Sequence, residues 1–387
     1  MRFFKKEPEF KFMNKKFLAF IISVLIIIAG GIILKTRGFN LGIDFTGGTL
    51  VEVSYRIPIS INKLRKKLAK VGLEKSIIQR IGEKENKFFI KTIKFSETSD
   101  QDLNLDEQEK FSKTIKDALL SPEEKSLLTE GKKDINNMSE KAIADYLSSK
   151  GIPEDEALES AAKITTFKNK SSTGLIVSRQ ELETLDLKKT VESLIEKDTF
   201  LGNFTFLSVE IVGPQVGHDL RKKVTLAAFW ALLGMLIYIG FRFHFIYGLA
   251  AVITLFHDLL ICLAFILFFN VELSLKVVAA LLTIIGYSLN DTIVIFDRVR
   301  DNVKMMRRDN AEMILDRSIN QTLSRTIVTS STTFITVLAL FFLGGEVIHT
   351  FAFTLMVGIL VGTYSSIFQS CAWLKIWEKN FLGKKNK

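Results

Sequence analysis

The stretch GYSLNDTIVIFDR, residues 286–298, places Asn290 and Asp291 in the middle of an otherwise apolar run. The run begins near Val277 and is long enough for an α-helix that crosses a bilayer. An ionisable side chain at membrane depth costs several kcal/mol unless a partner or water compensates for it. The stretch therefore predicts a membrane helix with one polar side, either hydrated or protein-facing, and Asp291 is its first candidate functional residue.

Five further apolar segments indicate a polytopic α-helical membrane protein. The apolar fraction of 48% is ordinary, so the distribution of these residues is the informative feature. Each segment has about 18–25 residues, the length a helix needs to cross a hydrocarbon core of roughly 30 Å. One such segment could be a buried helix of a large soluble protein, but six together predict six transmembrane helices. The segments are 17–34, 224–241, 246–269, 277–296, 323–343 and 350–374.

The net charge of +10 lies along the flanks of these segments, which does not favour nucleic-acid binding. If the segments alternate across the membrane, the basic flanks fall on one side. This positive-inside pattern predicts that both termini are cytoplasmic. The short connections 270–274 and 344–349 carry few basic residues and are predicted to lie outside. The basic flanks hold Arg2, Lys5, Lys6, Lys11, Lys15 and Lys16, then Arg242 and His244, then Arg298, Arg300, Lys304, Arg307, Arg308 and Arg317, and finally Lys375, Lys379, Lys384, Lys385 and Lys387.

The same pattern divides the chain. We expect the first apolar segment to be a retained anchor, because KTRGFN at 35–40 offers no small-residue signal-cleavage site. The predicted parts are a basic cytoplasmic N-terminus at 1–16, the first span at 17–35, an extracytoplasmic domain at 36–222, spans two to four at 223–298, a basic cytoplasmic loop at 299–322, spans five and six at 323–375, and a cytoplasmic tail at 376–387.

The extracytoplasmic domain is predicted to be α+β and ferredoxin-like. Alternating residues predict strands within 41–55, 76–82, 87–94 and 204–213, and helical periodicity marks 60–72 and 187–197. The resulting order β-α-β-β-α-β matches the split ferredoxin-like motif. A charged, Ser-rich insertion at about 96–186 separates the third strand from the second helix. Amphipathic pieces at 111–120 and 140–151 favour a helical insertion, and partial disorder is the alternative.

The segment GIDFTGGT, residues 42–49, opens this domain. Its glycines, Gly42, Gly47 and Gly48, permit tight or positive-φ backbone, and Asp44 beside Phe45 can accept hydrogen bonds from nearby amides. A phosphate site is not favoured, because the Lys and Ser/Thr spacing of a P-loop is missing. We therefore predict a structural turn where the chain leaves the membrane.

Polar residues recur on single faces of the predicted spans. In the fourth span Thr283, Tyr287 and Asp291 follow at four-residue intervals, and Asn290 and Ser288 widen this stripe. The third span carries His257 and Asp258 near its middle. The remaining groups are Arg325, Thr329, Thr332 and Thr336 on one face of the fifth span, and Gly358, Gly362 and Ser366 in the sixth, where the spacing favours close helix packing.

These residues allow a functional and a structural interpretation. In the first, Asp291 carries protons, because burial favours its protonated form and a mobile Arg325 guanidinium would favour the ionised one. The predicted proton pathway then consists of Asp291, Arg325, Asn290, Tyr287, Thr329, His257 and Asp258. In the second, Arg325 is an anchor that reaches the interface, His257 is satisfied by backbone, and Asp258 is a hydrogen-bond donor between helices. Asp291 is harder to explain structurally, because carboxylates well inside a span are rare.

Chemical catalysis and cofactor binding have little support. Cys262 and Cys371 both lie within spans, and the four histidines are scattered, so neither a metal site nor a disulfide framework is predicted. No nucleophile–base pair or P-loop is evident. We expect no enzyme activity and no cofactor, with protons as the only coupling ion.

Five motifs closely resemble the SecF family of the bacterial protein-export machinery, which is of the resistance-nodulation-division type. They are LGIDFTGGTLVEV (41–53), VEIVGPQVGHDLRKK (209–223), LFHDLLI (255–261), LLTIIGYSLNDTIVIFDRVRDN (281–302) and SINQTLSRTIVTS (318–330). The resemblance implies proton-motive-force-driven protein export at the inner membrane. In that family the carboxylate of the NDT motif and the arginine of the LSRT motif are implicated in proton conduction, and they match Asp291 and Arg325. The HD pair and the D-F-x-G-G turn also match family motifs, with less definite roles.

The resemblance also implies partners: SecD, the SecYEG channel, YajC, the translocating unfolded polypeptide and the lipid bilayer, but no nucleic acid. The chain departs from the family pattern in its long insertion at 96–186. Two alternatives remain. One is a proton-coupled exporter of a lipid or small molecule with the same architecture, and the other is a structural accessory whose membrane charges only pack helices.

Overall fold

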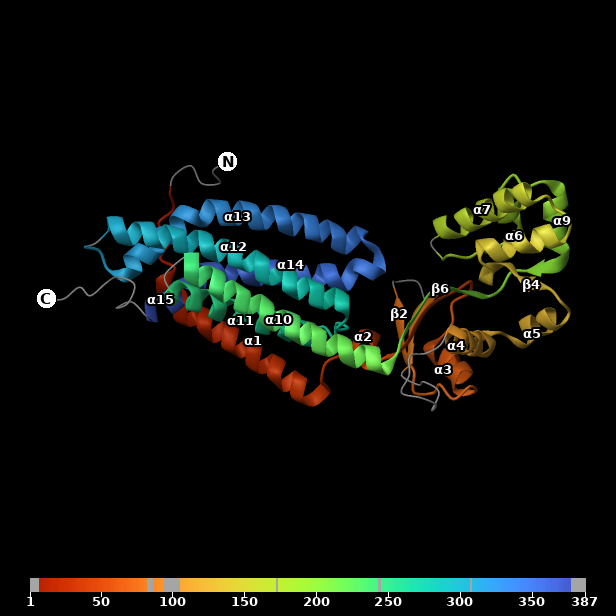
Figure 1. The fold of residues 1–387 in the computed structure, drawn as a ribbon, viewed down its shortest axis with the longest axis horizontal. Helices are drawn as coiled ribbons and strands as arrows, with labels where there is room; N and C mark the ends of the chain where they lie inside the picture. Colours follow the sequence, from red (N-terminus) through yellow and green to blue (C-terminus); the bar gives the residue numbers. More distant parts are fainter. Residues whose placement is uncertain are drawn as a thin grey trace. The chain divides into compact units, whose positions relative to one another are not determined.

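The computed structural model describes residues 7–81, 86–92, 105–171, 173–242, 245–306 and 308–376. They form two compact units, a membrane unit of Met1–Phe45 with Asp219–Lys387 and an α/β unit of Thr46–His218 (Figure 1). Several predicted features lie outside the described residues. They are His244, Arg307, the start of the predicted basic N-terminus at 1–6, the start of the predicted insertion at 96–104 and most of the predicted tail, 377–387. Each unit is considered by itself below.

Six long apolar helices among the described residues confirm the six predicted membrane spans. Length and composition alone make each of them able to cross a bilayer. They are α1 (Lys16–Arg37), α10 (Pro214–Arg242), α11 (Phe245–Phe268), α12 (Leu275–Met305), α13 (Ala311–Leu343) and α14 (Gly345–Phe368) with its continuation α15 (Ser370–Ile376). A short 3-10 turn, η1 (Met13–Lys15), precedes α1.

The predicted cytoplasmic loop at 299–322 is mostly helix, which corrects its assignment as a loop. Only residues 306–310 separate α12 from α13. Asn302 and Ser318, on the facing extensions of these two helices, are joined by a hydrogen bond of 2.8 Å, and Asn310 caps α13 by accepting from the Met313 backbone N–H. Hydropathy marks only the lipid-spanning part of a helix, so charged turns beyond the membrane escape it.

Helices α12 and α14 approach closely at two glycines. A Cβ atom on Gly358 would overlap the side chain of Ile284, and one on Gly362 would lie 3.1 Å from the Ser288 Cβ. These glycines are four residues apart on α14, as are their partners on α12. The prediction of close helix contact at Gly358 and Gly362 is therefore confirmed.

Contacts between helix ends occur at both ends of the membrane unit, as expected for helices that alternate in direction. At one end the Lys16 ammonium contacts Glu312 at 2.7 Å, Lys375 contacts the same carboxylate, and the Met13 N–H donates to Asp316 Oδ1 at 2.9 Å. The starts of α1 and α13 and the end of α15 therefore lie together. At the other end, the Gly42 N–H donates to the Leu273 carbonyl at 2.7 Å, which joins the exit of α1 to the α11–α12 connection.

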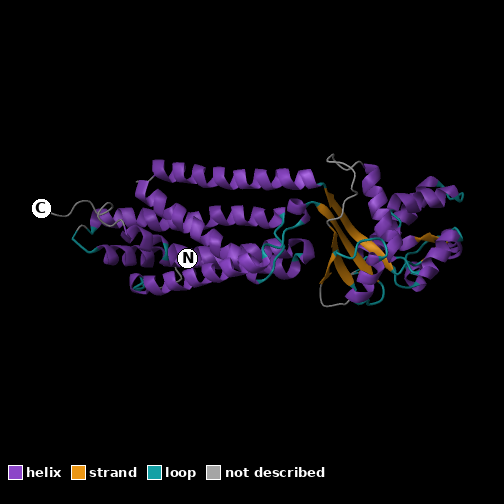
Figure 2. Ribbon diagram, turned by 90° about the horizontal axis from the view of Figure 1, so that it is seen from below, coloured by secondary structure: helices purple, strands orange, loops and turns teal. Residues whose placement is uncertain are grey.

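The α/β unit is built on a four-stranded antiparallel sheet (Figure 2). Its strands are β1 (Gly48–Tyr55), β2 (Ile77–Ile81), β3 (Lys87–Thr92) and β6 (Phe204–Val212), in the order β2-β3-β1-β6. Helix α3 (Ile61–Ala69) connects β1 to β2 and begins at the N-cap Ser60. This order and the antiparallel pairing of every neighbour agree with the predicted ferredoxin-like motif.

The second helix of this motif is not the predicted one. Helix α4 (Leu105–Leu119), which was assigned to the insertion, packs against α3 and joins the core of the sheet. Helix α9 (Lys189–Asp198) forms where a helix was predicted, but its apolar side belongs to another core. Both helices have one apolar face, and periodicity does not say which core that face covers. The sheet core contains Val51, Val53, Leu64, Leu68, Phe88, Ile90, Ile115, Leu119 and Phe204.

The insertion is helical and lies between α4 and β6, so its predicted bounds of 96–186 are wrong at both ends. It contains α5 (Pro122–Thr129), β4 (Lys133–Asp134), η2 (Ile135–Asn137), α6 (Glu140–Ser149), α7 (Glu154–Lys170), α8 (Arg179–Glu183), α9 and β5 (Thr199–Phe200). Buried Asn136 joins two of its loops, because its amide donates to the carbonyls of Ile176 and Gly202 at 3.1 and 3.0 Å. The core of the insertion includes Ile143, Leu147, Ala157, Ala161, Ile164, Val191 and Ile195.

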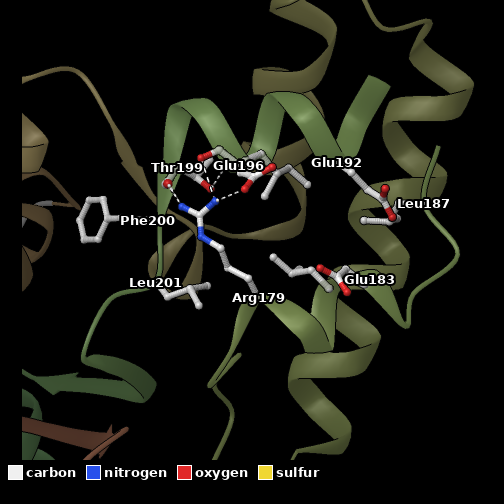
Figure 3. Close-up of a pocket in the computed structure, with 10 residues that line it drawn as sticks. Arg179, Glu183, Leu187, Glu192, Glu196, Thr199, Phe200 and Leu201 are labelled. Atoms are coloured by element: carbon white, nitrogen blue, oxygen red, sulfur yellow. Dashed lines mark hydrogen bonds and ion pairs between the residues drawn. The ribbon is translucent and has the colours of Figure 1, made fainter. Parts of the chain in front are cut away.

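A small cavity of about 110 Å³ lies between α8 and α9 (Figure 3). Arg179 projects along it and donates to the carbonyls of Glu196 and Thr199 at 2.9 and 3.4 Å. Glu196 lies in the last turn of α9 and Thr199 is the residue that follows the helix, where backbone acceptors lack helical partners. The guanidinium therefore caps α9, which gives this cavity a structural role.

Candidate functional site

Helix α12 places Asp291 inside the membrane unit. The helix begins at the N-cap Ser274, whose hydroxyl accepts from the Val277 N–H, and runs unbroken past the carboxylate. Asp291 is 4% exposed, and its Oδ2 accepts one hydrogen bond of 3.4 Å from the Ser330 hydroxyl on α13. Thr363 on α14 in turn donates to Ser330 at 2.8 Å. A chain of two hydroxyls thus connects the buried acid of α12 to α13 and α14.

Arg325 lies on α13 and is exposed on the surface of the membrane unit. Among the described residues no ion pair within 4.0 Å joins it to Asp291, although its positive charge acts on that carboxylate. Arg325 and Ser330 are five residues apart, so their side chains point about 140° away from each other around the helix. The helix that contacts Asp291 through Ser330 therefore presents its guanidinium on a different face.

The predicted polar stripe of α13 faces outward. Thr332 and Thr336 are exposed and Thr329 is partly exposed. Each of their hydroxyls donates to a carbonyl of its own helix one turn back, with Thr329 donating to Arg325 at 3.0 Å and Thr332 to Val328 at 2.9 Å. These hydroxyls are satisfied locally, whereas the Arg325 charge has no such internal partner on α13.

The polar stripe of α12 changes from exposed to buried along its length. Thr283 is exposed, Tyr287 is intermediate and Asp291 is buried. The Tyr287 hydroxyl is buried and has no hydrogen-bond partner among the described residues. Asn290, predicted as part of the proton pathway, is exposed, and its side chain lies about 100° around the helix from that of Asp291.

His257 and Asp258 form a second buried cluster, which is separate from Asp291. His257 Nδ1 lies 2.9 Å from Asp258 Oδ1 within α11. Asp258 Oδ2 accepts from the Ser288 hydroxyl of α12 at 2.5 Å and from the Ser365 hydroxyl of α14 at 2.7 Å. His257 Nε2 lies 2.8 Å from the Ser23 hydroxyl of α1. Ser23 and Ser365 were not predicted as site residues, because a single serine in an apolar helix has no distinctive spacing.

The motif turn fixes the start of α12. It contains the short helix α2 (Ile43–Thr46), within which Phe45 is 4% exposed. Asp44 Oδ2 accepts from the Leu275 N–H at 2.7 Å, and the Phe45 carbonyl accepts from Arg221 of α10 at 2.6 Å. Gly42 has no room for a side chain, since its Cβ would lie 3.0 Å from the Leu273 oxygen.

The two following glycines have left-handed φ angles, 68° at Gly47 and 133° at Gly48. Such angles favour glycine strongly over residues with a Cβ atom. The turn therefore has a structural role, which rests on backbone hydrogen bonds and on the cap that Asp44 provides for α12. Within the part of the chain that the structure describes, no group of three or more His, Cys, Asp or Glu side chains is arranged to hold a metal ion.

Comparison with known proteins identifies the family. Residues 191–380 match the protein export membrane protein SecD/SecF C-terminal family, and residues 32–56 match the SecD/SecF GG motif. The protein translocase subunit SecF of Koribacter versatilis is 39% identical over 375 residues, which cover 94% of this chain and 90% of the relative. The chain belongs to the SecF family. The SecF subunit of Escherichia coli O157:H7 is 30% identical over 363 residues, covering 94% of this chain and 86% of that relative.

A solved structure agrees with this assignment. The crystal structure of SecDF from Thermus thermophilus, described as a translocon-associated membrane protein, has a TM-score of 0.66 and 27% sequence identity to this chain. The match covers 97% of this SecF-family chain but only 39% of the longer SecDF chain. The resemblance deduced from the motifs is thereby confirmed, together with the six-span membrane fold.

Proposed function

We propose that this chain, paired with SecD, uses the proton motive force to promote protein export and exchanges protons at Asp291. The observation that carries the proposal is the weak attachment of this carboxyl, which is 4% exposed yet has, among the residues that the structure describes, a single hydrogen bond of 3.4 Å. An ionised carboxylate only accepts hydrogen bonds, whereas a protonated one also donates. With one long bond to lose or rearrange, Asp291 can change its protonation state at little cost in contacts.

Arg325 supplies the second element of the mechanism. It lies on the helix adjacent to Asp291, is exposed, and is not paired with the carboxylate. Movement of the guanidinium toward Asp291 would favour release of the proton, and movement away would favour its uptake. Carrying one charge through the membrane potential supplies about 2.3 kcal/mol per 100 mV, which is enough to bias a conformational change more than tenfold.

A SecD subunit is the proposed cover for the outward face of α13. Arg325 and the neighbouring threonines form a polar stripe on the surface of the membrane unit, and an uncovered guanidinium in lipid is costly. The SecDF neighbour is a longer chain, of which this chain matches 39%. The SecYEG channel, YajC and an unfolded translocating polypeptide complete the proposed set of partners.

The proposed location is a bacterial inner membrane with both termini cytoplasmic. Support comes from the end of the membrane unit where Lys16, Glu312 and Lys375 meet, since the predicted basic flanks gather there. Basic residues favour the cytoplasmic side. The opposite end, which leads into the α/β unit at Thr46, would then face outward.

The test compares Asp291→Asn with the control Asp297→Asn, whose carboxylate is 44% exposed and lies in an end-of-span pair with Arg300. Both are assembled with SecD, and export of a secretory precursor into vesicles is measured with and without a proton gradient. We expect Asp291→Asn to lose the gradient-dependent part while the control retains it. If Asp291→Asn keeps full dependence of export on the proton gradient, the chain is a structural accessory.

Depletion of the chain from cells is a separate test. If secretory precursors are still processed normally after this depletion, the result favours an exporter of small molecules.

A further inference from the structure

The polar cluster around Asp258 joins four membrane helices. It consists of Ser23 on α1, His257 and Asp258 on α11, Ser288 on α12 and Ser365 on α14. Asp258 and Ser288 are 1% and 0% exposed, and Ser365 is also fully buried. A buried carboxyl is tolerated when donors converge on it. This "Asp258 cluster" therefore connects helices that are far apart in the sequence at one point of the bundle.

The contacts of Asp258 differ in kind from those of Asp291. Asp258 has three contacts of 2.5–2.9 Å, two from serine hydroxyls and one from an imidazole nitrogen. Within the described part of the chain, Asp291 has one hydrogen bond, of 3.4 Å. Any change in the state or position of the Asp258 carboxyl would disturb three short bonds at once. Such a group is suited to holding helices in place, whereas the loosely held Asp291 is suited to gaining and losing a proton.

Helix geometry transmits this restraint to Asp291. Ser288 precedes Asp291 by three residues on α12, so the two side chains lie about 60° apart around the axis and about 4.5 Å apart along it. Fixing the direction of Ser288 toward α11 and α14 thus fixes the direction of Asp291 toward α13. The approach of α14 at Gly362, whose Cβ would lie 3.1 Å from that of Ser288, makes the same position the point of close packing.

We infer that Asp258 is a positioning residue, which sets the rotation of α12 and thereby aims Asp291 at Ser330. His257 extends the restraint to α1 by its contact of 2.8 Å with Ser23. Helix α1 is thus held by the Asp258 cluster and does more than anchor the chain in the membrane. This orientation of α12 does not require Asp291 to carry protons, whereas its consequence for transport rests on the proposed function of Asp291.

The order Ser23–His257–Asp258 also has the contacts of a hydrolase triad, with Ser23 at 2.8 Å from His257 Nε2. Ser23 is 1% exposed and is shared with the amide of Gln369 at 3.2 Å, inside a bundle of apolar helices. A nucleophile must reach its substrate. The burial of Ser23 therefore assigns this cluster to helix positioning.

A cross-linking experiment tests the geometric claim without any proton transport. In a Cys262→Ala, Cys371→Ala chain, the pair Asp291→Cys and Ser330→Cys is introduced, and the rate of oxidative disulfide formation is measured in membranes. Adding Asp258→Ala or Ser288→Ala is expected to slow cross-linking about tenfold, as loss of a buried hydrogen bond would. Thr254→Ala is the control, because Thr254 is fully buried on α11 but its hydroxyl donates to Ala250 of its own helix. Unchanged rates in folded Asp258→Ala and Ser288→Ala chains would overturn the inference.

A second measurement separates positioning from proton carriage. With Asp291 intact, Asp258→Asn is expected to lower the maximal gradient-dependent export while the pH midpoint of that export stays in place. A shifted midpoint, with cross-linking unchanged, would make Asp258 a proton carrier and refute its positioning role. If the unmodified complex shows no gradient dependence while cross-linking still requires Asp258, the proposed function fails and the positioning role survives.

Discussion

The side chain of Asp44 accepts a hydrogen bond of 2.7 Å from the backbone N–H of Leu275. Asp44 belongs to the turn that follows α1, and Leu275 is the first residue of α12, the helix that carries Asp291. The motif turn thus satisfies one of the backbone donors that a helix start leaves unpaired. A residue near the N-terminus thereby helps to fix the helix that holds the buried acid.

Replacing Asp44 should destabilise the start of α12. Loss of a cap costs about 1 kcal/mol, so Asp44→Ala is expected to lower the midpoint of thermal unfolding in detergent. Asp44→Asn keeps an acceptor oxygen and should retain most of the stability. Equal midpoints for Asp44→Ala and the unmodified chain would show that the cap contributes nothing.

The α12–α14 contact should not tolerate a larger residue at its glycines. Gly358→Ala would place a methyl group against Ile284, and overpacking of this kind costs about 1–3 kcal/mol. Gly286→Ala is the matched control, since a Cβ there would meet nothing within 4 Å. Denaturant or thermal unfolding of the two variants should separate them. If adding Ile284→Ala restores the stability that Gly358→Ala loses, the overlap between the two side chains is the cause.

The ion pairs at the end of the bundle should contribute little, and less at high salt. Glu312 contacts both Lys16 and Lys375, but 38% of its side chain is exposed. Exposed ion pairs are worth about 0.2–1 kcal/mol and are screened by salt. The stability lost in Glu312→Gln should therefore be small at low salt and smaller at high salt. A large, salt-independent loss would mean that Glu312 acts by another contact.

The contribution of Asp134 to the stability of the α/β unit should decrease as the pH rises from acid values. Burial raises the pKa of this carboxyl above its usual value of 3.8, despite hydrogen bonds from Asn137 and from the N–H groups of Gly202 and Asn136. The folded chain therefore holds this proton at a pH where the unfolded chain has released it. Its stabilising contribution is complete below 3.8 and is lost as pH rises through the folded pKa.

The check is the difference in unfolding free energy between the unmodified chain and Asp134→Asn, measured from pH 3.8 upward. As pH rises, the unfolding free energy of the unmodified chain should fall relative to that of Asp134→Asn, and the difference should level off at neutral pH. A difference that moves in the opposite direction would mean that the three hydrogen bonds outweigh burial.

The comparison of α4 and α9 shows where sequence patterns stop being informative. Both segments have an apolar face, and both form helices. The structure assigns Ile115 and Leu119 to the core of the sheet, and Val191 and Ile195 to the core of the insertion. The pattern of a single helix describes its own buried face but contains no information about the surface that covers it.

The two acids of the membrane unit show the same division. Their depth follows from their place in long apolar runs, which is why Asp291 and Asp258 could be selected from the sequence. Their partners, Ser330 for one and Ser288 with Ser365 for the other, come from different helices. These partners give the acids opposite properties, one weakly held and one tightly held.

The sequence by itself determined the six membrane helices, the strands of the ferredoxin-like sheet and the family, because span length, alternation and motif spacing are local properties of the chain. Only the tertiary structure decided that α4 covers the sheet, that Asp44 caps α12, and that Asp258 rather than Asp291 is the point where four helices are joined. Those outcomes depend on the rotation and approach of one helix relative to another, and such relations belong to pairs of elements rather than to any single stretch of residues.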